Sequence, residues 1–292
     1  MAINGDGVAT KVQGAPIRSG ESANPFEDRF VAFVDILGFR DLVTRAETDR
    51  DTFELLRDVL ERIDAQAQHL EEYRQLCDSP TPRHVVSSLP RTDVTMTAVS
   101  DCYFLSEKAS DNEGDKSPWH LMAAVQALCS NLLAHNILTR GAIVRGGAFH
   151  RGRVAFGPAM IEAYDIEHHV AKYPRILVTD KVRKAIRLEE QVFWDGKLLL
   201  RDIDSCWFIN VLAPPLSRWT AVSNDTPKDA RDFLRGVRSL LEDKLRESRQ
   251  LRHLSKIKWM VHHFNLVAAK YGLAISEDIE SDTEQTAETH DQ

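Results

Sequence analysis

Two aspartates stand where apolar segments of the sequence end, and their positions suggest metal chemistry. The apolar run 30–34 leads directly into Asp35, and the run 94–99 is followed by Ser100 and Asp101. Mg²⁺ and Mn²⁺ prefer carboxylate oxygens and keep coordination positions for water and phosphates. Either aspartate alone fits an ordinary turn or cap. Because both follow a segment that predicts a buried strand, we favour a divalent-metal site for a nucleoside triphosphate.

The residues after Asp35 predict a tight turn that opens a helix. This turn consists of Ile36, Leu37, Gly38 and Phe39. Gly38 lets the backbone approach a ligand closely, and successive backbone N–H groups in such a turn can cradle a polyphosphate. We therefore expect Leu37, Gly38 and Phe39 to bind substrate.

The elements that position these residues follow the order strand, helix, strand, strand, helix, strand. Apolar residues at helical spacing predict a helix from Thr52 and a second helix near Ser117. Between them a hairpin turn is expected at Asp101, and two strands are expected within 140–156. This is the order of the ferredoxin-like βαββαβ fold, so the predicted fold class is α+β with extra strands. Because the first and third strands are neighbours in that sheet, Asp35 and Asp101 are expected to converge. Further elements are expected at 158–169 (helix), 175–179 (strand) and 198–212 (one or two strands).

Four local features add expectations. Asp51 is the expected cap of the first long helix, and Ser117 is the expected N-cap of the second, with Pro118 at its first position. The charged segment 107–116 is expected to form a surface loop. The glycine pair 146–147 indicates a bulge or a close approach of backbone or ligand.

The chain divides into segments of different composition. Two helices predicted at 229–247 and 253–271 are expected to form a helical hairpin, and we favour a simple packing appendage over a dimer contact. The segments are a disordered leader (1–25), a catalytic domain (26–213), a C-terminal helical extension (214–275) and an acidic disordered tail (276–292).

Length, charge and cysteine content exclude several classes of protein. With 292 residues, 43% of them hydrophobic, the chain can bury a full core, and a net charge of −7 argues against a nucleic-acid binder. The four cysteines form no C-x-x-C pair, so neither a zinc site nor a disulfide framework is indicated and we expect buried or incidental thiols. No segment reaches the about 20 apolar residues of a transmembrane helix. We expect a soluble cytoplasmic protein with no membrane partner.

The two aspartate motifs resemble a known family. The segment F-V-D-I-L-G-F at 33–39 resembles the F-x-D-I-x-G-F motif of class III nucleotidyl cyclases. The segment V-S-D-C-Y-F at 99–104 resembles their second motif, in which an aspartate lies in a hairpin turn. The D-I-L-G-F variant and G-P-A-M-I-E-A-Y-D-I-E at 157–167 are similar to the pyrimidine cyclases of bacterial Pycsar anti-phage systems. The resemblance covers residues 28–212.

This resemblance implies a homodimeric enzyme that makes a 3′,5′-cyclic nucleotide. Two Mn²⁺ or Mg²⁺ ions, held by Asp35, Asp101 and the backbone carbonyl of Ile36, would align the ribose 3′-hydroxyl for attack on the α-phosphate, with pyrophosphate leaving. The implied substrate is UTP and the product cyclic UMP, a second messenger in anti-phage defence that a separate effector reads. The nearest alternative is a cytidylate cyclase, which converts CTP to cyclic CMP.

Three residues carry expectations about the base. Thr97, four positions before Asp101, stands where purine cyclases often carry the Lys or Glu that reads the base, and its short hydroxyl favours a different base or a different reading geometry. Phe33 falls where the family places a wall of the base pocket, and a role as an ordinary core residue fits equally well. Tyr164 is a candidate to stack on the base, although a single aromatic on a helix is more often part of the core or an interface.

In one respect the sequence departs from the family. Ile161 and Asp165 stand about where the purine enzymes have an Asn and an Arg, and that Arg stabilises charge on the transferring phosphate. The candidate replacement cation is Arg145, with Arg140 and Arg151 also near in sequence. A catalytically degenerate nucleotide-binding module is the alternative if no cation takes this place.

Two other enzyme classes fit less well. A diguanylate cyclase or polymerase palm would share the fold and the metals, but the sequence has S-D-C-Y at 100–103 instead of a G-G-D/E-E-F turn. A zinc hydrolase would need the pair His168 and His169 or the pair His262 and His263. Adjacent residues on a helix point about 100° apart, so neither pair forms a chelate by itself.

Overall fold

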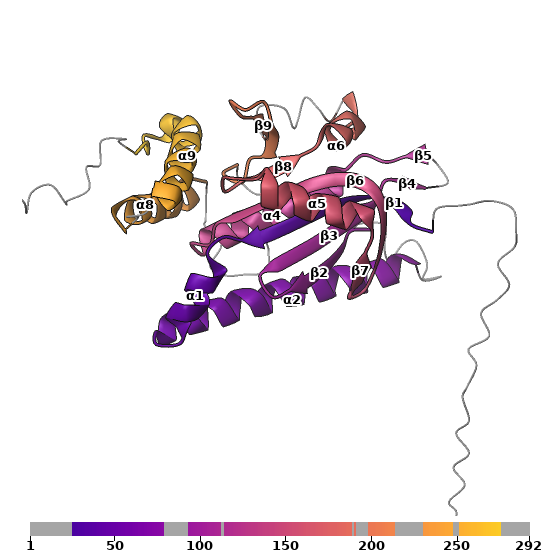
Figure 1. Ribbon diagram of the computed structural model, residues 1–292, viewed down its shortest axis with the longest axis horizontal. Coiled ribbons are helices and arrows are strands. Elements are labelled where there is room, and N and C mark those ends of the chain that lie inside the picture. The colour runs from indigo at the N-terminus through magenta and orange to yellow at the C-terminus, as the bar shows by residue number, and fades with distance from the viewer. Residues whose placement is uncertain are drawn as a thin grey trace, which may run out of the picture.

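An eight-stranded sheet forms the centre of the computed structural model, in the order β2-β3-β1-β6-β8-β10-β9, with β7 paired to β6 (Figure 1). The structure describes residues 25–78, 93–111, 114–188, 190, 198–213, 230–247 and 251–275. The strands are β1 (Glu27–Ile36), β2 (Thr95–Val99), β3 (Cys102–Lys108), β6 (Thr139–Arg151), β7 (Val154–Phe156), β8 (Ile176–Val178), β9 (Leu199–Arg201) and β10 (Trp207–Ile209), and the short β4 (Ser110–Asp111) and β5 (Gly114–Asp115) form a separate pair. The helices are α1 (Phe39–Ala46), α2 (Arg50–Asp78), α4 (Trp119–Ala134), α5 (Pro158–His169), α6 (Asp180–Ala185), α8 (Ala230–Glu247) and α9 (Leu251–Ala268), followed by the 3₁₀ turn η1 (Ala269–Tyr271).

The first half of the chain has the predicted ferredoxin-like topology. Strand β1 lies between β3 and β6 and is antiparallel to both. The elements β1, α2, β2, β3, α4 and β6 follow the order βαββαβ, and their strands lie in the order β2-β3-β1-β6. This arrangement confirms the predicted α+β fold class. Beyond it, β8 adds to β6 in parallel, and β10 and β9 extend the sheet.

Strand β1 is a continuous apolar run because helices cover both faces of the sheet. Phe30, Ala32 and Val34 belong to the main core, which includes residues of α2 and α4. Val31 and Phe33 point to the opposite face, where α5 packs (Figure 1). Each of these five residues is at most 3% exposed. The run therefore has the pattern expected of a strand buried on both sides.

Strand β6 contains no bulge at its glycine pair. The register of β6 with β1 is continuous from Glu27 opposite Ala148 to Ile36 opposite Thr139, so the predicted bulge at 146–147 is wrong. The alternative, a close approach, is correct, because a Cβ added to Gly146 would lie 3.4 Å from the Cβ of Ala159 on α5.

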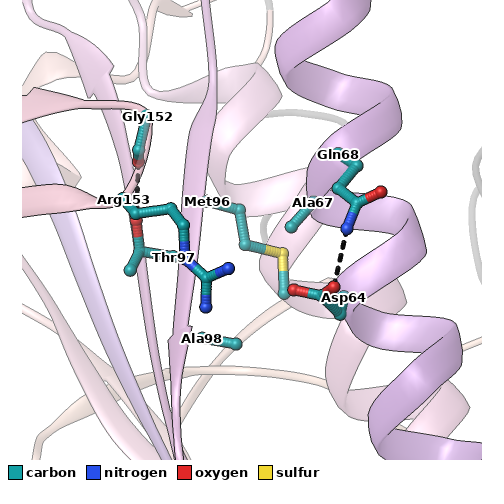
Figure 2. Close-up of a pocket in the computed structure, with 8 residues that line it drawn as sticks. All are labelled: Asp64, Ala67, Gln68, Met96, Thr97, Ala98, Gly152 and Arg153. Atoms are coloured by element: carbon teal, nitrogen blue, oxygen red, sulfur yellow. Dashed lines mark hydrogen bonds between the residues drawn. The ribbon is translucent and has the colours of Figure 1, made fainter.

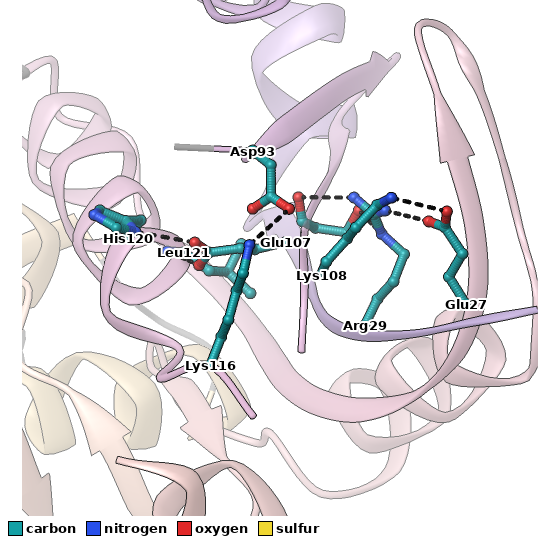
Figure 3. A network of polar contacts seen from close by, with 9 residues as sticks. Glu27, Arg29, Asp93, Glu107, Lys108, Lys116, His120 and Leu121 are labelled. Atoms are coloured by element: carbon teal, nitrogen blue, oxygen red, sulfur yellow. Dashed lines mark hydrogen bonds and ion pairs between the residues drawn. The ribbon is translucent and has the colours of Figure 1, made fainter. Parts of the chain in front are cut away.

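We had predicted a surface loop at 107–116, but part of this segment is buried. Strand β3 continues through Lys108, and Glu107 is only 2% exposed. The carboxylate of Glu107 accepts hydrogen bonds from the backbone N–H of Leu121 and from Nδ1 of His120, both at 3.0 Å (Figure 3). It thereby satisfies an N–H group that has no partner within α4 and raises the pKa of His120.

The caps of two helices differ from the prediction by one or two residues. Helix α4 begins at Trp119 with Pro118 as its N-cap, and the hydroxyl of Ser117 donates to Glu190 instead of capping the helix. Helix α2 begins at Arg50, so Asp51 lies in its first turn. The carboxylate of Asp49 takes the capping role, because it accepts the backbone N–H of Asp51 at 3.1 Å.

Helices α8 and α9 form the predicted helical hairpin and pack against the rest of the chain (Figure 1). On the α8 side, Phe233, Val237 and Leu241 belong to the main core. On the α9 side, the indole of Trp259 donates to Asp202 at 2.8 Å. Apolar packing and a polar contact therefore both attach the hairpin to the domain.

A buried arginine anchors this contact. The Arg175 side chain is 1% exposed and forms ion pairs with Asp202 and Asp204. Its hydrogen bond lowers the pKa of Asp204 to about 2. The guanidinium of Arg175 also lies over the rings of Tyr173 and Trp259, at 5.3 and 5.8 Å from their centroids.

Some expectations fall outside the described residues. The leader, apart from Pro25, and the tail 276–292 are among them. Within the described part of the chain, no helix has the length and apolar character needed to cross a membrane.

Gly141 provides a test of the packing between β1 and β6. A Cβ added there would lie 2.0 Å from the carbonyl oxygen of Phe33, so the strands would have to separate. We expect Gly141→Ala to lower the free energy of unfolding by about 3 kcal/mol in a denaturant titration. The matched change Gly236→Ala meets nothing within 4 Å on α8 and should raise it by about 1 kcal/mol. Equal stability of the two variants would contradict this packing.

Candidate metal site

One row of side chains crosses three strands at the end of β1. Asp35 lies opposite Cys102 of β3 and opposite Arg140 of β6. Residues paired in register project on the same face of a sheet, so these three side chains share the face that α5 covers. The site is therefore assembled by strand pairing.

The turn between β2 and β3 brings Asp101 to this row. Ser100 has a positive φ of 57°, which turns the chain sharply, and the carbonyl of Asp101 accepts the backbone N–H of Ile36 at 3.0 Å. One ligand atom from each of Asp35, Asp101 and Cys102 lies within 4.8 Å of the others. The predicted convergence of the two aspartates is thus present in the structure.

The donor set fits a divalent ion. Two carboxylates held at this separation provide the oxygen ligands that Mg²⁺ or Mn²⁺ takes from protein. The N–H of Ile36 donates to the carbonyl of Asp101 and ties the backbone of Ile36, the third predicted ligand, to this turn. Asp35, Asp101 and Ile36 remain the residues that would hold the ion.

Cys102, which we had expected to be a buried or incidental thiol, belongs to this cluster. Its Sγ–H lies 3.8 Å from Oδ1 of Asp35 and 3.6 Å from Oδ1 of Asp101. Burial, and then the two nearby carboxylates, raise the pKa of this thiol, so it is neutral and can donate its single hydrogen to either aspartate. Its place directly after Asp101 was a signal, but only the pairing of β3 with β1 turns it toward Asp35.

The positive charge at the site comes from Arg140. Its Nε donates to Oδ2 of Asp35 at 3.2 Å and also forms an ion pair with Glu167 of α5. Burial raises the pKa of Asp35, the guanidinium of Arg140 opposes this rise, and the charge of Asp101 adds to it. Burial also raises the pKa of Glu167 to about 7, against the attraction of Arg140. Glu167 was not predicted as a site residue.

Arg145, which we had expected at the site, lies elsewhere in this chain. It pairs in register with Phe30, five residues before Asp35 and therefore on the opposite face of the sheet. Its guanidinium forms ion pairs with Asp28 at 2.8 Å and Asp115 at 2.9 Å. The register places Arg140 beside Asp35 instead.

Arg151, the other arginine considered for this role, and the residues at the positions of the family's Asn and Arg, Ile161 and Asp165, supply no cation to the carboxylates. Arg151 lies over the ring of Phe149, at 6.0 Å from its centroid. Ile161 is 64% exposed, and Asp165 is exposed on the same helix. Helix α5 thus supplies Glu167 to the row and no cation at position 165.

The turn after β1 has the predicted shape. Gly38 has φ 77° and is the N-cap of α1. The N–H of Leu37 donates to the carbonyl of Leu138 at 2.8 Å, so Leu37 contributes no free N–H to a phosphate. The N–H groups of Phe39 and Arg40 open helix α1 and have no partner inside it.

Phe33 lies in the core beneath α5. It is 3% exposed, and its ring centroid is 4.9 Å from that of Phe104 and 5.6 Å from that of Tyr164. This is the position of a core residue, one of the two roles we had considered. Tyr164 is 47% exposed and stacks on His168, so part of its ring is open to solvent.

The hydroxyl of Thr97 is fully engaged inside the chain. Thr97 is 5% exposed, and its Oγ1 donates to the carbonyl of Gly152 at 2.9 Å. Because that bond uses the hydroxyl hydrogen, Nε2 of His150, also at 2.9 Å, must donate to Oγ1. Thr97 also lines a pocket between β2, α2 and the β6–β7 turn, where the amide of Gln68 donates to Asp64 (Figure 2).

The histidine pairs do not form a metal cluster. Among the described residues, the group of His, Cys, Asp and Glu side chains that could hold an ion contains no histidine. His263 is buried, and its Nε2 lies 3.3 Å from Oδ1 of Asn210. The rings of His168 and His169 contact each other.

Comparisons with known proteins gave distant structural similarity only. No protein-family model and no curated protein matches the sequence. The catalytic core of a rhodopsin-guanylyl cyclase with converted specificity, in complex with ATPαS, is 14% identical, with a TM-score of 0.39 over 63% of this chain and 96% of that one. A class III adenylyl cyclase-like ATP-binding protein from Pseudomonas aeruginosa is 13% identical, with a TM-score of 0.33 over 58% of this chain and 37% of that one.

Glu167 makes stability depend on pH. Its pKa is raised from 4.5 to about 7 in the folded chain, so the stability it contributes is fully present below about pH 4.5 and is lost as the pH rises through about 7. Between pH 5 and pH 8, we expect the melting temperature of the wild type to fall by at least about 2 °C more than that of Glu167→Gln. Melting curves of both proteins across this range test it, and a constant difference would contradict the raised pKa.

Proposed function

We propose that this chain is a nucleotidyl cyclase that converts UTP to 3′,5′-cyclic UMP and pyrophosphate. The observation that carries the proposal is the convergence of Asp35 and Asp101 at the ends of two paired strands, with ligand atoms within 4.8 Å. The resemblance of these two motifs to class III cyclases supplies the reaction. Conversion of CTP to cyclic CMP is the alternative within the same chemistry.

The residues of the site have distinct roles in this proposal. Asp35 and Asp101, with the Ile36 carbonyl, hold the divalent ions. When bound, these ions supply Lewis-acid activation of the 3′-hydroxyl and charge neutralisation at the phosphates. The N–H groups of Phe39 and Arg40 at the start of α1 bind and orient phosphate. The dipole of α1 favours negative charge at the same place.

The proposed pyrimidine specificity rests on position 97. Thr97 carries no long side chain that could read a purine edge, and its hydroxyl is already bonded to Gly152 and His150. Backbone groups and Tyr164, which is half exposed, are the remaining candidates for contacts to a small base. We place the product as a second messenger in anti-phage defence that a separate effector reads, on the resemblance to Pycsar cyclases.

A catalytically degenerate nucleotide-binding module is the second candidate. It is favoured by Asp165, which provides no cation where the purine enzymes have an Arg, and by the engagement of Arg140 with Asp35 and Glu167. Such a protein would bind nucleotide and ion without turnover.

The test is incubation with ATP, GTP, CTP or UTP and Mn²⁺, with products resolved by mass. We expect cyclic UMP from UTP, and a loss of at least about 100-fold in rate for Asp35→Asn and for Asp101→Asn. The control Asp243→Asn removes an exposed carboxylate on α8 and should keep full activity. A cyclic product from ATP or GTP would refute the pyrimidine assignment, and nucleotide binding without any product would favour the degenerate module.

We further propose that the chain acts as a homodimer through the outer surface of α5. Ile161 and Tyr164 of α5, and Val170 directly after it, are large side chains exposed by 64%, 47% and 43%. Exposed apolar side chains gathered on one helix are typical of interaction surfaces. The resemblance to cyclases supports a second copy of this chain as the occupant.

Sedimentation velocity tests the dimer. Ile161→Asp places a charge in the proposed interface and should weaken dimerisation at least about tenfold. Leu266→Asp makes the same change at a residue 70% exposed on α9 and should leave the dimer intact. A wild-type protein that sediments as a monomer at all concentrations would refute the proposal.

A further inference from the structure

A single N–H group at the metal site faces two carboxylates. Nε of Arg140 donates its hydrogen to Oδ2 of Asp35 at 3.2 Å and is also in ion-pair contact with Oε1 of Glu167. One N–H makes one well-directed hydrogen bond, and here the bond goes to Asp35. Within the described part of the chain, Oε1 of Glu167 has no well-directed hydrogen bond, although Nε of Arg140 lies closer to it than to Oδ2 of Asp35.

This leaves an unusual buried acceptor. The Glu167 side chain is 3% exposed, compared with 16% for Asp35 and 21% for Arg140. A buried carboxylate oxygen without a donor costs free energy, so such groups normally have a partner or a reason to lack one. The nearest donor is the same Nε that now serves Asp35.

We propose that Arg140 is a movable counter-cation that is shared between Asp35 and Glu167 when Asp35 holds no divalent ion and pairs with Glu167 alone when it does. The inference deepens the proposed function, because it rests on Asp35 as a metal ligand and assigns what sets the affinity of that site. Arg140 and Glu167 are positioning residues in this scheme.

The charges give the reason for the exchange. Asp35 and Asp101 are close and both negative, so without an ion Arg140 offsets part of their repulsion. A divalent ion on Asp35 makes the neighbouring guanidinium a like charge. Glu167 offers that guanidinium a second carboxylate within the same contact, so Arg140 can leave Asp35 without becoming a buried unpaired charge.

Mn²⁺ affinity, measured without nucleotide from the electron paramagnetic resonance signal of the free ion, tests this exchange. Glu167→Gln should weaken binding about tenfold, because Arg140 then has only Asp35. Arg140→Gln should strengthen binding about tenfold, because it removes the competitor. In the Arg140→Gln background, adding Glu167→Gln should change the affinity less than about twofold.

Three controls make the result decisive. Glu162→Gln removes the same charge from the same helix at a partly exposed position and should leave the affinity within about twofold of wild type. Asp35→Asn should abolish binding in every background. Melting curves report whether each variant folds. If Glu167→Gln does not fold, the Mn²⁺ affinity of Arg140→Gln alone decides whether the inference holds.

The outcomes that contradict this inference differ from the outcomes that contradict the proposed function. Equal affinities for Glu167→Gln and Glu162→Gln, or weaker binding by Arg140→Gln, would overturn the counter-cation even if Asp35-dependent turnover is found. The predicted affinity pattern without turnover of any nucleotide would refute the cyclase and leave this inference standing. A wild-type protein that binds no Mn²⁺ would overturn both.

Discussion

The register of β1 with its two neighbours is the constraint on which the candidate site depends. Asp35 meets Cys102 on one side and Arg140 on the other because ladders of hydrogen bonds fix both pairings. A slip of one residue in β6 would turn Arg140 to the opposite face and leave Asp35 without its cation. Gly141, next to Arg140, leaves no room for a Cβ against the carbonyl oxygen of Phe33, so the two strands lie close together at this register.

The electrostatics of the row follow from its position at the end of an apolar strand. Burial raises the pKa of Asp35 and of Glu167, and Arg140 opposes both shifts. Asp35 and Asp101 bring two carboxylates together, and the guanidinium of Arg140 offsets only part of this charge because it also contacts Glu167. Such an arrangement favours the binding of a further cation, which is the property that a phosphate-handling metal site requires.

The fold was predictable because it depends on local patterns. The run 30–34 and the segment 158–169 were recognisable from apolar content and helical spacing, and α5 lies within the predicted limits. The convergence of Asp35 and Asp101 followed from strand order alone. Capping was less predictable, because Glu107 reaches the start of α4 only through the tertiary arrangement of β3.

The choice of cation shows the limit of sequence reasoning at the site. Arg140 and Arg145 lie on one strand, and which of them meets Asp35 depends on the pairing of β6 with β1. Odd and even positions of a strand alternate faces, so an error of five positions changes both distance and face. Cys102 and Glu167 were missed for the same reason, since each reaches the row through a partner distant in sequence.

The C-terminal hairpin belongs to the same electrostatic environment as the site. The charge of Lys256 on α9 lowers the pKa of Glu167, which burial raises. Trp259 of the same helix donates to Asp202, whose partner Arg175 accepts the backbone N–H of Gly141 through its carbonyl at 3.1 Å. Because Gly141 adjoins Arg140, a displacement of α9 would act on Arg140 through the backbone and on Glu167 through charge. The hairpin therefore contacts the domain both through apolar packing and through the charge of Lys256.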